Sequence, residues 1–276
     1  MKEEKIKSLL LGSASVFLVL FCLTPFVTMI LTSLSRNPEF LAPESAFRPT
    51  LQNFRSVLTD TNLHFMDYLR NSLLIAGLSA FFGVWIAGLA AYALTRFAVR
   101  GKYVILFFAL TASMFPSISL VSYLFKLMTQ LGWINTLQGL VFPYIAWVLP
   151  LSLWILASYF VRIPLELDKA AWIDGCTPFQ TLRRIILPVA APGIFSVGIL
   201  SFIYAFNELL FAMMLTYDHH ARTVPVGITL FQGLHGQIPW GTIMAASCVT
   251  TLPVVLLAIF FQKRIVQGLT RGAVKG

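Results

Sequence analysis

Long runs of apolar residues recur along this chain of 276 residues and constrain its fold more than any other feature. Each run is about 20 residues long, the length that an α-helix needs to cross the hydrocarbon core of a bilayer. Hydrophobic residues make up 58% of the chain and charged residues only 11%, which is far outside the usage of soluble domains. The sequence therefore predicts an all-α, polytopic membrane protein with six transmembrane helices. We expect these spans at residues 9–34, 68–95, 103–125, 137–161, 191–215 and 241–262.

The distribution of lysine and arginine predicts the orientation of these spans. With both termini in the cytoplasm, 14 of the 20 basic residues lie on the inner side, as the positive-inside rule requires. The inner set is Lys2, Lys5, Lys7, Arg96, Arg100, Lys102, Arg162, Lys169, Arg183, Arg184, Lys263, Arg264, Arg271 and Lys275. The same asymmetry accounts for the net charge of +9. Because the basic residues are scattered over short loops, we expect membrane lipid but no nucleic acid as a partner.

A polar stretch at 164–188 separates the fourth and fifth spans and has the signals of two short helices hinged at a glycine. Gly175 suits a left-handed helix C-terminus, and Thr177 can cap a second helix together with Pro178 and Gln180. We expect Phe179, Leu182 and Ile186 to share one face of that helix and Arg183 to lie elsewhere. An ordinary amphipathic loop resting on lipid headgroups remains an alternative.

These residues carry a resemblance to a known family. The segment Asp168-Lys-Ala-Ala-Trp-Ile-Asp-Gly175, followed by Leu187-Pro188 and Pro192, resembles the cytoplasmic coupling motif of permease subunits in binding-protein-dependent ABC importers. The tail at 268–276, the segment 114–121 and the pair Asn207-Glu208 resemble the MalG-like sugar-importing branch, in particular its trehalose- and maltose-type members. One position departs from the motif, because Lys169 stands where a glutamate is usual and the acid is one place earlier, at Asp168.

The resemblance implies a type I ABC importer permease fold and a set of partners. These are a second permease subunit, two ATP-binding subunits, a periplasmic or lipid-anchored binding protein and a sugar substrate, at the cytoplasmic (inner) membrane of a prokaryote. We expect an N-terminal anchor helix and outer loop at 1–67, because the first apolar run is longer than that of a signal peptide, and a transport domain at 68–276. The expected ATPase-coupling residues are Asp168, Lys169, Ala170, Ala171, Asp174, Gly175, Arg183 and Gly276.

Polar residues inside the expected spans are candidates for the sugar pathway. Asn207 and Glu208 fall mid-span, with Tyr204 one helical turn before Glu208, and buried ionisable groups in a membrane are costly. Ser117 follows Pro116 in the third span, where a helix break would suit a gate or a pathway lining. The alternative for Glu208 is a structural hydrogen bond to a neighbouring helix or to the partner permease.

Two stretches, 35–67 and 216–240, are expected on the outside. The second contains the adjacent residues His219 and His220, but their spacing does not suit a metal site, so we expect no metal and a solvated loop. In maltose-type importers this outer loop of the MalG-like subunit reaches into the binding protein. The resemblance therefore implies a contact loop containing Phe231, Gln232, Gly233, His235 and Gln237.

The chain lacks the motifs of an enzyme. It has no phosphate-binding loop of the G-x-x-x-x-G-K-[ST] kind, no catalytic triad order and no metal-ligand pair at helical spacing. We expect no catalytic residues and no cofactor in this chain, with ATP and magnesium bound by the partner ATPase. A stand-alone secondary carrier or channel for a small polar solute is the alternative, although such carriers usually contain several intramembrane ionisable groups.

Overall fold

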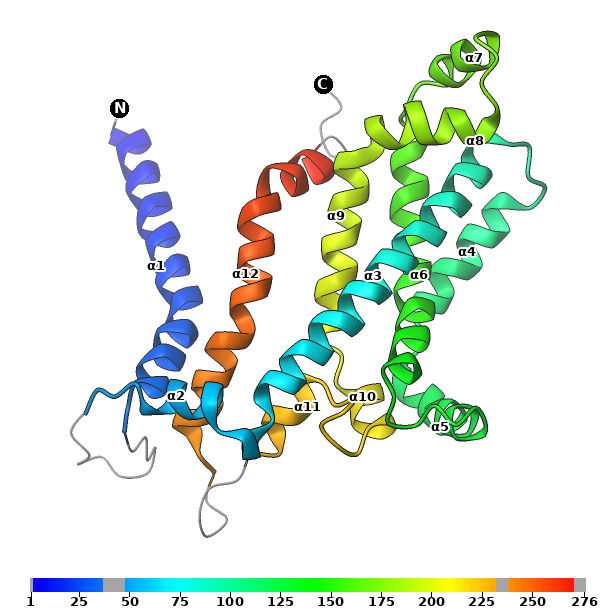
Figure 1. The fold of residues 1–276 in the computed structure, drawn as a ribbon. Coiled ribbons are helices and arrows are strands. Elements are labelled where there is room, and N and C mark those ends of the chain that lie inside the picture. The colour runs from blue at the N-terminus through cyan, green and yellow to red at the C-terminus, as the bar shows by residue number, and fades with distance from the viewer. Residues whose placement is uncertain (1, 37–47, 232–237, 271–276) are drawn as a thin grey trace. The chain divides into compact units, whose positions relative to one another are not determined.

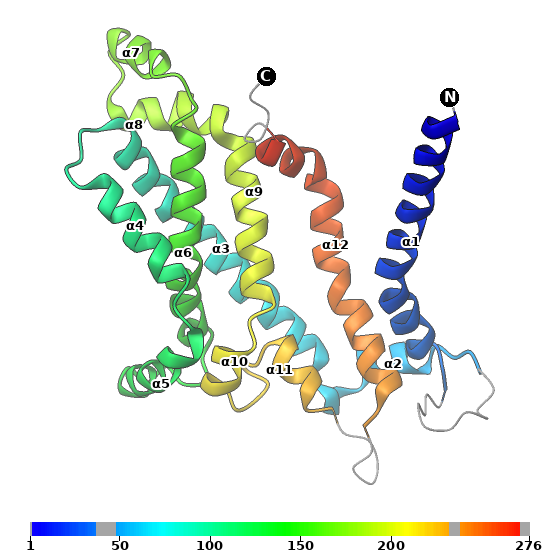
Figure 2. The same ribbon diagram turned by 180° about the vertical axis from the view of Figure 1, so that it is seen from behind.

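Helices make up most of the computed structural model, which describes residues 2–36, 48–231 and 238–270. Within these residues there is no strand beyond a single bridge between Ser35 and Pro49. The chain divides into two compact units, one of residues 1–66 and 228–252 and the other of residues 67–227 and 253–276 (Figures 1 and 2).

The helices follow the expected spans closely but not everywhere. Their bounds are α1 Lys2–Ser33, α2 Gln52–Thr59, η1 Thr61–Leu63, α3 Phe65–Arg96, α4 Lys102–Ser113, η2 Ser117–Leu120, α5 Val121–Gln130, α6 Leu137–Phe160, α7 Glu166–Ile173, α8 Pro178–Thr181, η3 Leu182–Ile186, α9 Leu187–Phe206, α10 Leu210–Leu215, α11 Val224–Thr229 and α12 Trp240–Thr270. Five helical segments in the described residues are long and apolar enough to cross a membrane, and a bent pair brings the number to as many as six.

The third span is not the single straight helix expected at 103–125. Helix α4 ends at Ser113, and the following pair η2 and α5 turns away by 93°. Pro116 lies in this break and has an extended backbone, with ψ of 122°. Because proline has no N–H to donate and its ring clashes with the preceding helical turn, the helix ends here instead of continuing.

Helix α1 leaves its apolar side chains uncovered. None of the 18-residue apolar window of this helix is buried within the chain, and Phe17 and Phe21 are 66% and 68% exposed. An apolar surface of this length requires lipid or another protein chain around it.

Helix α6 forms the centre of the larger unit and packs against α4 and α9. Its side chains Leu140, Tyr144, Leu156 and Phe160 are at most 1% exposed. Tyr144 belongs to an apolar cluster with residues of α3, α5 and α10, and Leu156 and Phe160 belong to a second cluster nearer to α8. The close approach of α9 depends on Gly193, where an added Cβ would lie 2.8 Å from ring atoms of Tyr159.

Figure 1 shows α7 and α8 at one end of this unit and α5 and α10 at the other. The last turn of α3 lies at the end that carries α7 and α8. The polar hairpin at 164–188 and the loop after α10 therefore lie at opposite ends of the spans.

Candidate functional site

The hinge of the hairpin formed by α7 and α8 has the expected local structure. Gly175 adopts the left-handed conformation with φ of 81°. The N–H of Gly175 donates to the carbonyl of Trp172 and that of Cys176 to the carbonyl of Ala171, which is a Schellman motif. Thr177 and Gln180 form both bonds of a capping box at the start of α8. The prediction of two helices hinged at a glycine is confirmed.

Helix α7 has an inner and an outer face, and the predicted coupling residues are divided between them. Lys169, Ala170 and Asp174 are exposed. Asp168 and Ala171 are 2% and 1% exposed, because they lie three residues apart on the side that packs against the protein. The expectation that Asp168 and Ala171 are presented on the hairpin surface is wrong. The other members of the predicted set, Gly175 and Arg183, are exposed.

The sequence interpretation missed the exposed apolar residues of the hairpin. Ile173 is 86% exposed and Trp172 is 43% exposed at the end of α7. Both directly precede the turn at Asp174 and Gly175. This position at the end of a short helix was the feature of the sequence that could have indicated their exposure. Ile173 and Trp172 thus place apolar surface next to the charged residues of the hairpin.

Phe179 is also exposed, at 64%, whereas Leu182 and Ile186 are buried. The three residues therefore differ in burial, although Phe179 and Leu182 line the same groove. Residues 182–186 form a π-helical turn, which is wider than an α-helical one and changes the angular offset between successive residues.

The expected fifth span is interrupted at the proposed pathway residues. Helix α9 ends at Phe206 and α10 begins at Leu210, so Asn207 and Glu208 lie in a break and not within a continuous helix over 191–215. The amide of Asn207 donates to the carbonyl of Ile203 at 2.8 Å, and this residue is exposed.

The carboxylate of Glu208 is engaged within the chain. Its Oε1 accepts the N–H of Phe211 at 2.8 Å, and its Oε2 accepts the N–H of Ala212 at 3.1 Å. The hydroxyl of Tyr144 donates to Oε2 at 2.5 Å. Glu208 thus satisfies N–H groups at the start of α10 that have no partner within the helix. These bonds support the interpretation of Glu208 as a structural residue over its interpretation as a lining of the sugar pathway.

Tyr204 does not pair with Glu208 but stacks on Trp147 of α6, with ring centroids 6.2 Å apart and planes 9° apart. The two rings border a small cavity of about 100 Å³ that is also lined by Ser113, Ser152 and Ser201. Tyr204 is 47% exposed. Ser117 is half-buried beside the break between α4 and α5.

A larger groove of about 740 Å³ lies between α3, α9 and the second half of α12. Among the described residues its lining is almost entirely apolar, with the aromatic residues Phe81, Trp85 and Phe202 and one charged residue, Arg183. A hydroxyl-rich sugar would lose its hydrogen bonds to water there without replacing them, so the groove is unsuited to such a ligand.

The loop after α10 is organised by two asparagines. Asn71, 3% exposed, donates to the carbonyls of His219, His220 and Arg222 at 2.9–3.1 Å. Asn135 donates to Oδ1 of Asp218 at 2.8 Å. That bond, followed by those from His220, lowers the pKa of Asp218 to about 2.

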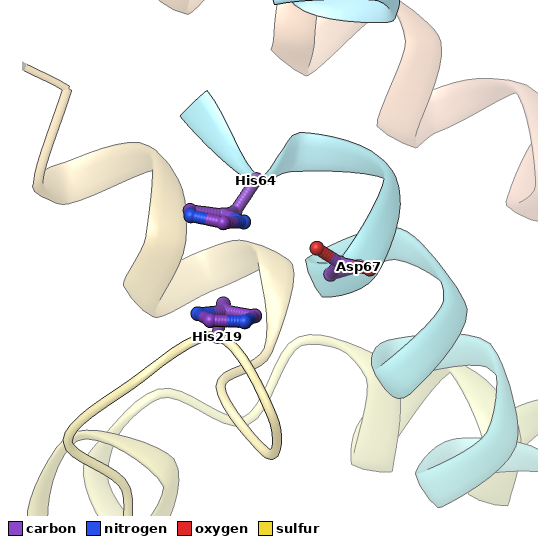
Figure 3. A group of neighbouring side chains, drawn as sticks. All are labelled: His64, Asp67 and His219. Atoms are coloured by element: carbon purple, nitrogen blue, oxygen red, sulfur yellow. The ribbon is translucent and has the colours of Figure 1, made fainter. Parts of the chain in front are cut away.

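The ligand atoms of Asp218, His219 and His220 lie within 4.8 Å of one another. However, Oδ1 of Asp218 already accepts the N–H of His220 and lies 3.0 Å from its Nδ1. Figure 3 shows His219 on this loop and Asp67 on the first turn of α3. The existing bonds of Asp218 hold its carboxylate beside His220.

Several predicted residues lie outside the described part of the chain. These are Gln232, Gly233, His235 and Gln237 of the expected contact loop and Gly276 at the C-terminus. Phe231 is described and is 6% exposed within the chain. Its expected contact with a binding protein stays a prediction.

Comparisons with known proteins define the class of this protein. Residues 79–271 match the family described as binding-protein-dependent transport system inner membrane component. A trehalose/maltose transport system permease protein, MalG, of Thermococcus litoralis is 53% identical over 277 aligned positions, covering 100% of both chains. A trehalose transport system permease protein, SugB, of Mycobacterium tuberculosis is 41% identical over 88% of this chain and 90% of its own.

The fold is also found in a solved structure. A chain from a bacterial ABC transporter that imports the acidic polysaccharide alginate superposes with a TM-score of 0.81. The match covers 95% of this chain and 98% of the other at 18% sequence identity, so it shows the fold alone.

The chain therefore belongs to the family of inner membrane components of binding-protein-dependent transport systems. Within that family it is a MalG-like permease subunit with the type I ABC importer fold. This membership overturns the alternative of a stand-alone secondary carrier or channel.

Proposed function

We propose that this permease subunit imports a disaccharide such as trehalose or maltose. The observation that supports this most strongly is the full-length similarity to MalG of Thermococcus litoralis, at 53% identity. In this proposal a second permease completes the pathway, two ATP-binding subunits drive it and a binding protein delivers the sugar. ATP and magnesium belong to the ATP-binding subunits, so this chain has no catalytic residues.

The outer face of the α7–α8 hairpin is the proposed contact with the ATP-binding subunits. It combines Lys169, Asp174 and Arg183, which offer charge, with the exposed apolar side chain of Ile173. Ala170 is small, so a neighbouring chain can approach α7 closely at that point. A surface with an apolar centre and charged margins is typical of protein interfaces. Nucleotide-driven closure of the partners would then move the hairpin and tilt the spans.

The aromatic pair Trp147 and Tyr204 is the proposed sugar-facing feature of this chain. Sugars present C–H groups that pack on aromatic rings and hydroxyls that need hydrogen-bond partners. The exposed ring of Tyr204 supplies the first, and Ser113 and Ser201 line the small cavity beside it. Asn207 and Ser117, each next to a helix break, would extend this polar surface along the pathway.

The proposed topology follows from the distribution of basic residues and from the family resemblance. We place both termini and the hairpin in the cytoplasm of a prokaryote, with residues 68–276 as the transport domain and 1–67 as anchor helix and outer loop. The segment at 231–237 would meet the binding protein and the tail at Gly276 would approach the ATP-binding subunits.

The experiment is uptake by the assembled complex in vesicles. The chain is co-expressed with its second permease and ATP-binding subunit, and entry of labelled trehalose and maltose is followed with ATP and the binding protein supplied. We expect uptake that vanadate blocks and that unlabelled trehalose or maltose competes away. Uptake that is indifferent to ATP, or competition only by other sugars or by glycerol phosphate, would contradict the proposal.

A further inference from the structure

We propose that a buried ion pair between Arg96 and Asp168 is the link through which movement of the α7–α8 hairpin reaches α3. This inference rests on the proposed function, because it assigns positioning roles within ATP-driven transport. It differs from a contact with the ATP-binding subunits, since neither side chain is available at the surface. The side chains of Arg96 and Asp168 are each 2% exposed.

The pair joins the last residue of α3 to the inner face of α7. Nε of Arg96 lies 3.1 Å from Oδ2 of Asp168. Within the described residues neither atom has a hydrogen-bond partner of good geometry, so each charge is balanced chiefly by the other. In a poorly polarisable interior, charges at this separation attract each other far more strongly than at the surface.

Two further hydrogen-bond donors extend the link to the rest of the hairpin. Nη2 of Arg96 donates to the carbonyl of Ile163, which precedes α7, at 3.0 Å. The hydroxyl of Tyr92, one turn earlier in α3, lies 3.3 Å from both Oδ1 of Asp168 and the carbonyl of Pro178 at the start of α8. The end of α3 is thus tied to the beginning of the hairpin, to α7 and to α8.

This arrangement favours movement of α3 and the hairpin as one body. Displacing α7 by itself would separate two buried charges, and an uncompensated buried charge is costly. Lys169 and Ile173 remain on the outer face of α7 to meet a partner, while Asp168 holds the inner face. The acid that precedes Lys169 is therefore used inside the chain.

The test compares transport per ATP hydrolysed in vesicles containing the complete complex. Asp168→Asn and Arg96→Gln each remove one charge and keep a polar side chain, and the first also keeps the shape. We expect both variants to co-purify with the ATP-binding subunits but to show a several-fold fall in sugar imported per ATP. The matched control is Glu166→Gln, because Glu166 is an exposed acid in the first turn of the same helix and should leave this ratio unchanged.

Two further variants separate coupling from folding. Tyr92→Phe keeps both charges and removes one hydroxyl, so it should give a smaller fall in the ratio even if the charge variants do not assemble. The exchanged pair Arg96→Asp with Asp168→Arg should restore part of the ratio lost in the single variants. An unchanged ratio in assembled Asp168→Asn, or a loss of stability without a change in the ratio, would overturn the inference.

The outcomes are distinguishable from failure of the proposed function. If the unmodified complex imports no disaccharide, the proposed substrate is wrong. If the unmodified complex imports it and every variant of the pair remains equally coupled, only the link between α7 and α3 is wrong. Loss of ATP-binding subunits in Asp168→Asn with normal thermal stability would mean that Asp168 contacts them directly, which also overturns the inference.

Discussion

The hydroxyl of Tyr144 donates a 2.5 Å hydrogen bond to Oε2 of Glu208, and this bond joins the centre of α6 to the break between α9 and α10. Tyr144 is 1% exposed, so the bond lies away from the outer surface of the chain. Glu208 also receives two backbone N–H groups of α10. Its main role in this conformation is therefore to hold the interrupted span together.

Glu208→Leu should destabilise the subunit more than Glu208→Gln. Leucine removes every acceptor, whereas glutamine keeps one carbonyl oxygen for the N–H groups of α10. Hydrogen bonds to charged groups each contribute about 1.5–3 kcal/mol, so a clear fall in melting temperature is expected for the leucine variant. The measurement is thermal unfolding of the purified complex. A changed KM for sugar in Glu208→Gln with no change in melting temperature would instead favour a pathway role.

The effect of a substitution at Gly175 should depend on the backbone conformation of the turn and not on the room for a side chain. No atom lies within 4 Å of a Cβ placed there, but φ is 81°. A left-handed conformation costs an ordinary residue about 1–2 kcal/mol and costs asparagine less. Gly175→Asn should therefore keep more transport activity than Gly175→Val, measured as ATP-driven uptake. Equal activity of the two variants would show that this turn is not required in its observed form.

Ile173 offers the sharpest test of the outer face of α7. Because it is 86% exposed, Ile173→Asp should not change the thermal stability of the isolated permease subunit. It should reduce the amount of ATP-binding subunit that co-purifies, since a charge would replace an apolar contact. Normal co-purification together with normal uptake would argue against this residue as part of the interface.

The contact of α6 with α9 requires a residue without a side chain at 193. A Cβ at Gly193 would lie 2.8 Å from the ring of Tyr159, so Gly193→Ala should overpack this contact and destabilise the subunit by about 1–3 kcal/mol. Gly198→Ala in the same helix is the control, because no atom lies within 4 Å of its added Cβ. Comparable melting temperatures for the two variants would contradict the close packing at Gly193.

The loop after α10 should lose stability in acid through Asp218. Its pKa is lowered from 3.8 to about 2 in the folded protein, so the ionised carboxylate stabilises the loop above the unfolded value. That contribution declines as the pH falls from about 4 to about 2, because protonation then favours the unfolded chain.

The measurement for Asp218 is the difference in melting temperature between the unmodified subunit and Asp218→Asn. The difference should be largest above pH 4 and should shrink as the pH falls below it. A difference independent of pH over that range would mean that ionisation of Asp218 does not support the loop.

In the α7–α8 hairpin, the local structure could be predicted from the sequence but the burial of its residues could not. The glycine turn and the capping box at Thr177 and Gln180 involve residues within a few positions of one another, so their chemistry was sufficient to predict them. The buried position of Asp168 was not predicted, because its partners Tyr92 and Arg96 are more than 70 residues away in the chain. No local pattern distinguishes an acid that faces a partner from one that pairs internally.

The sequence alone determined the membrane class, the approximate spans and the family resemblance, because a bilayer imposes the same requirement of length and apolarity on every span. Only the tertiary structure decided that the third and fifth spans are broken, that Glu208 caps α10 and that Asp168 is buried against α3. Those outcomes depend on which helices pack together, and packing brings into contact side chains whose separation along the chain carries no signal of it.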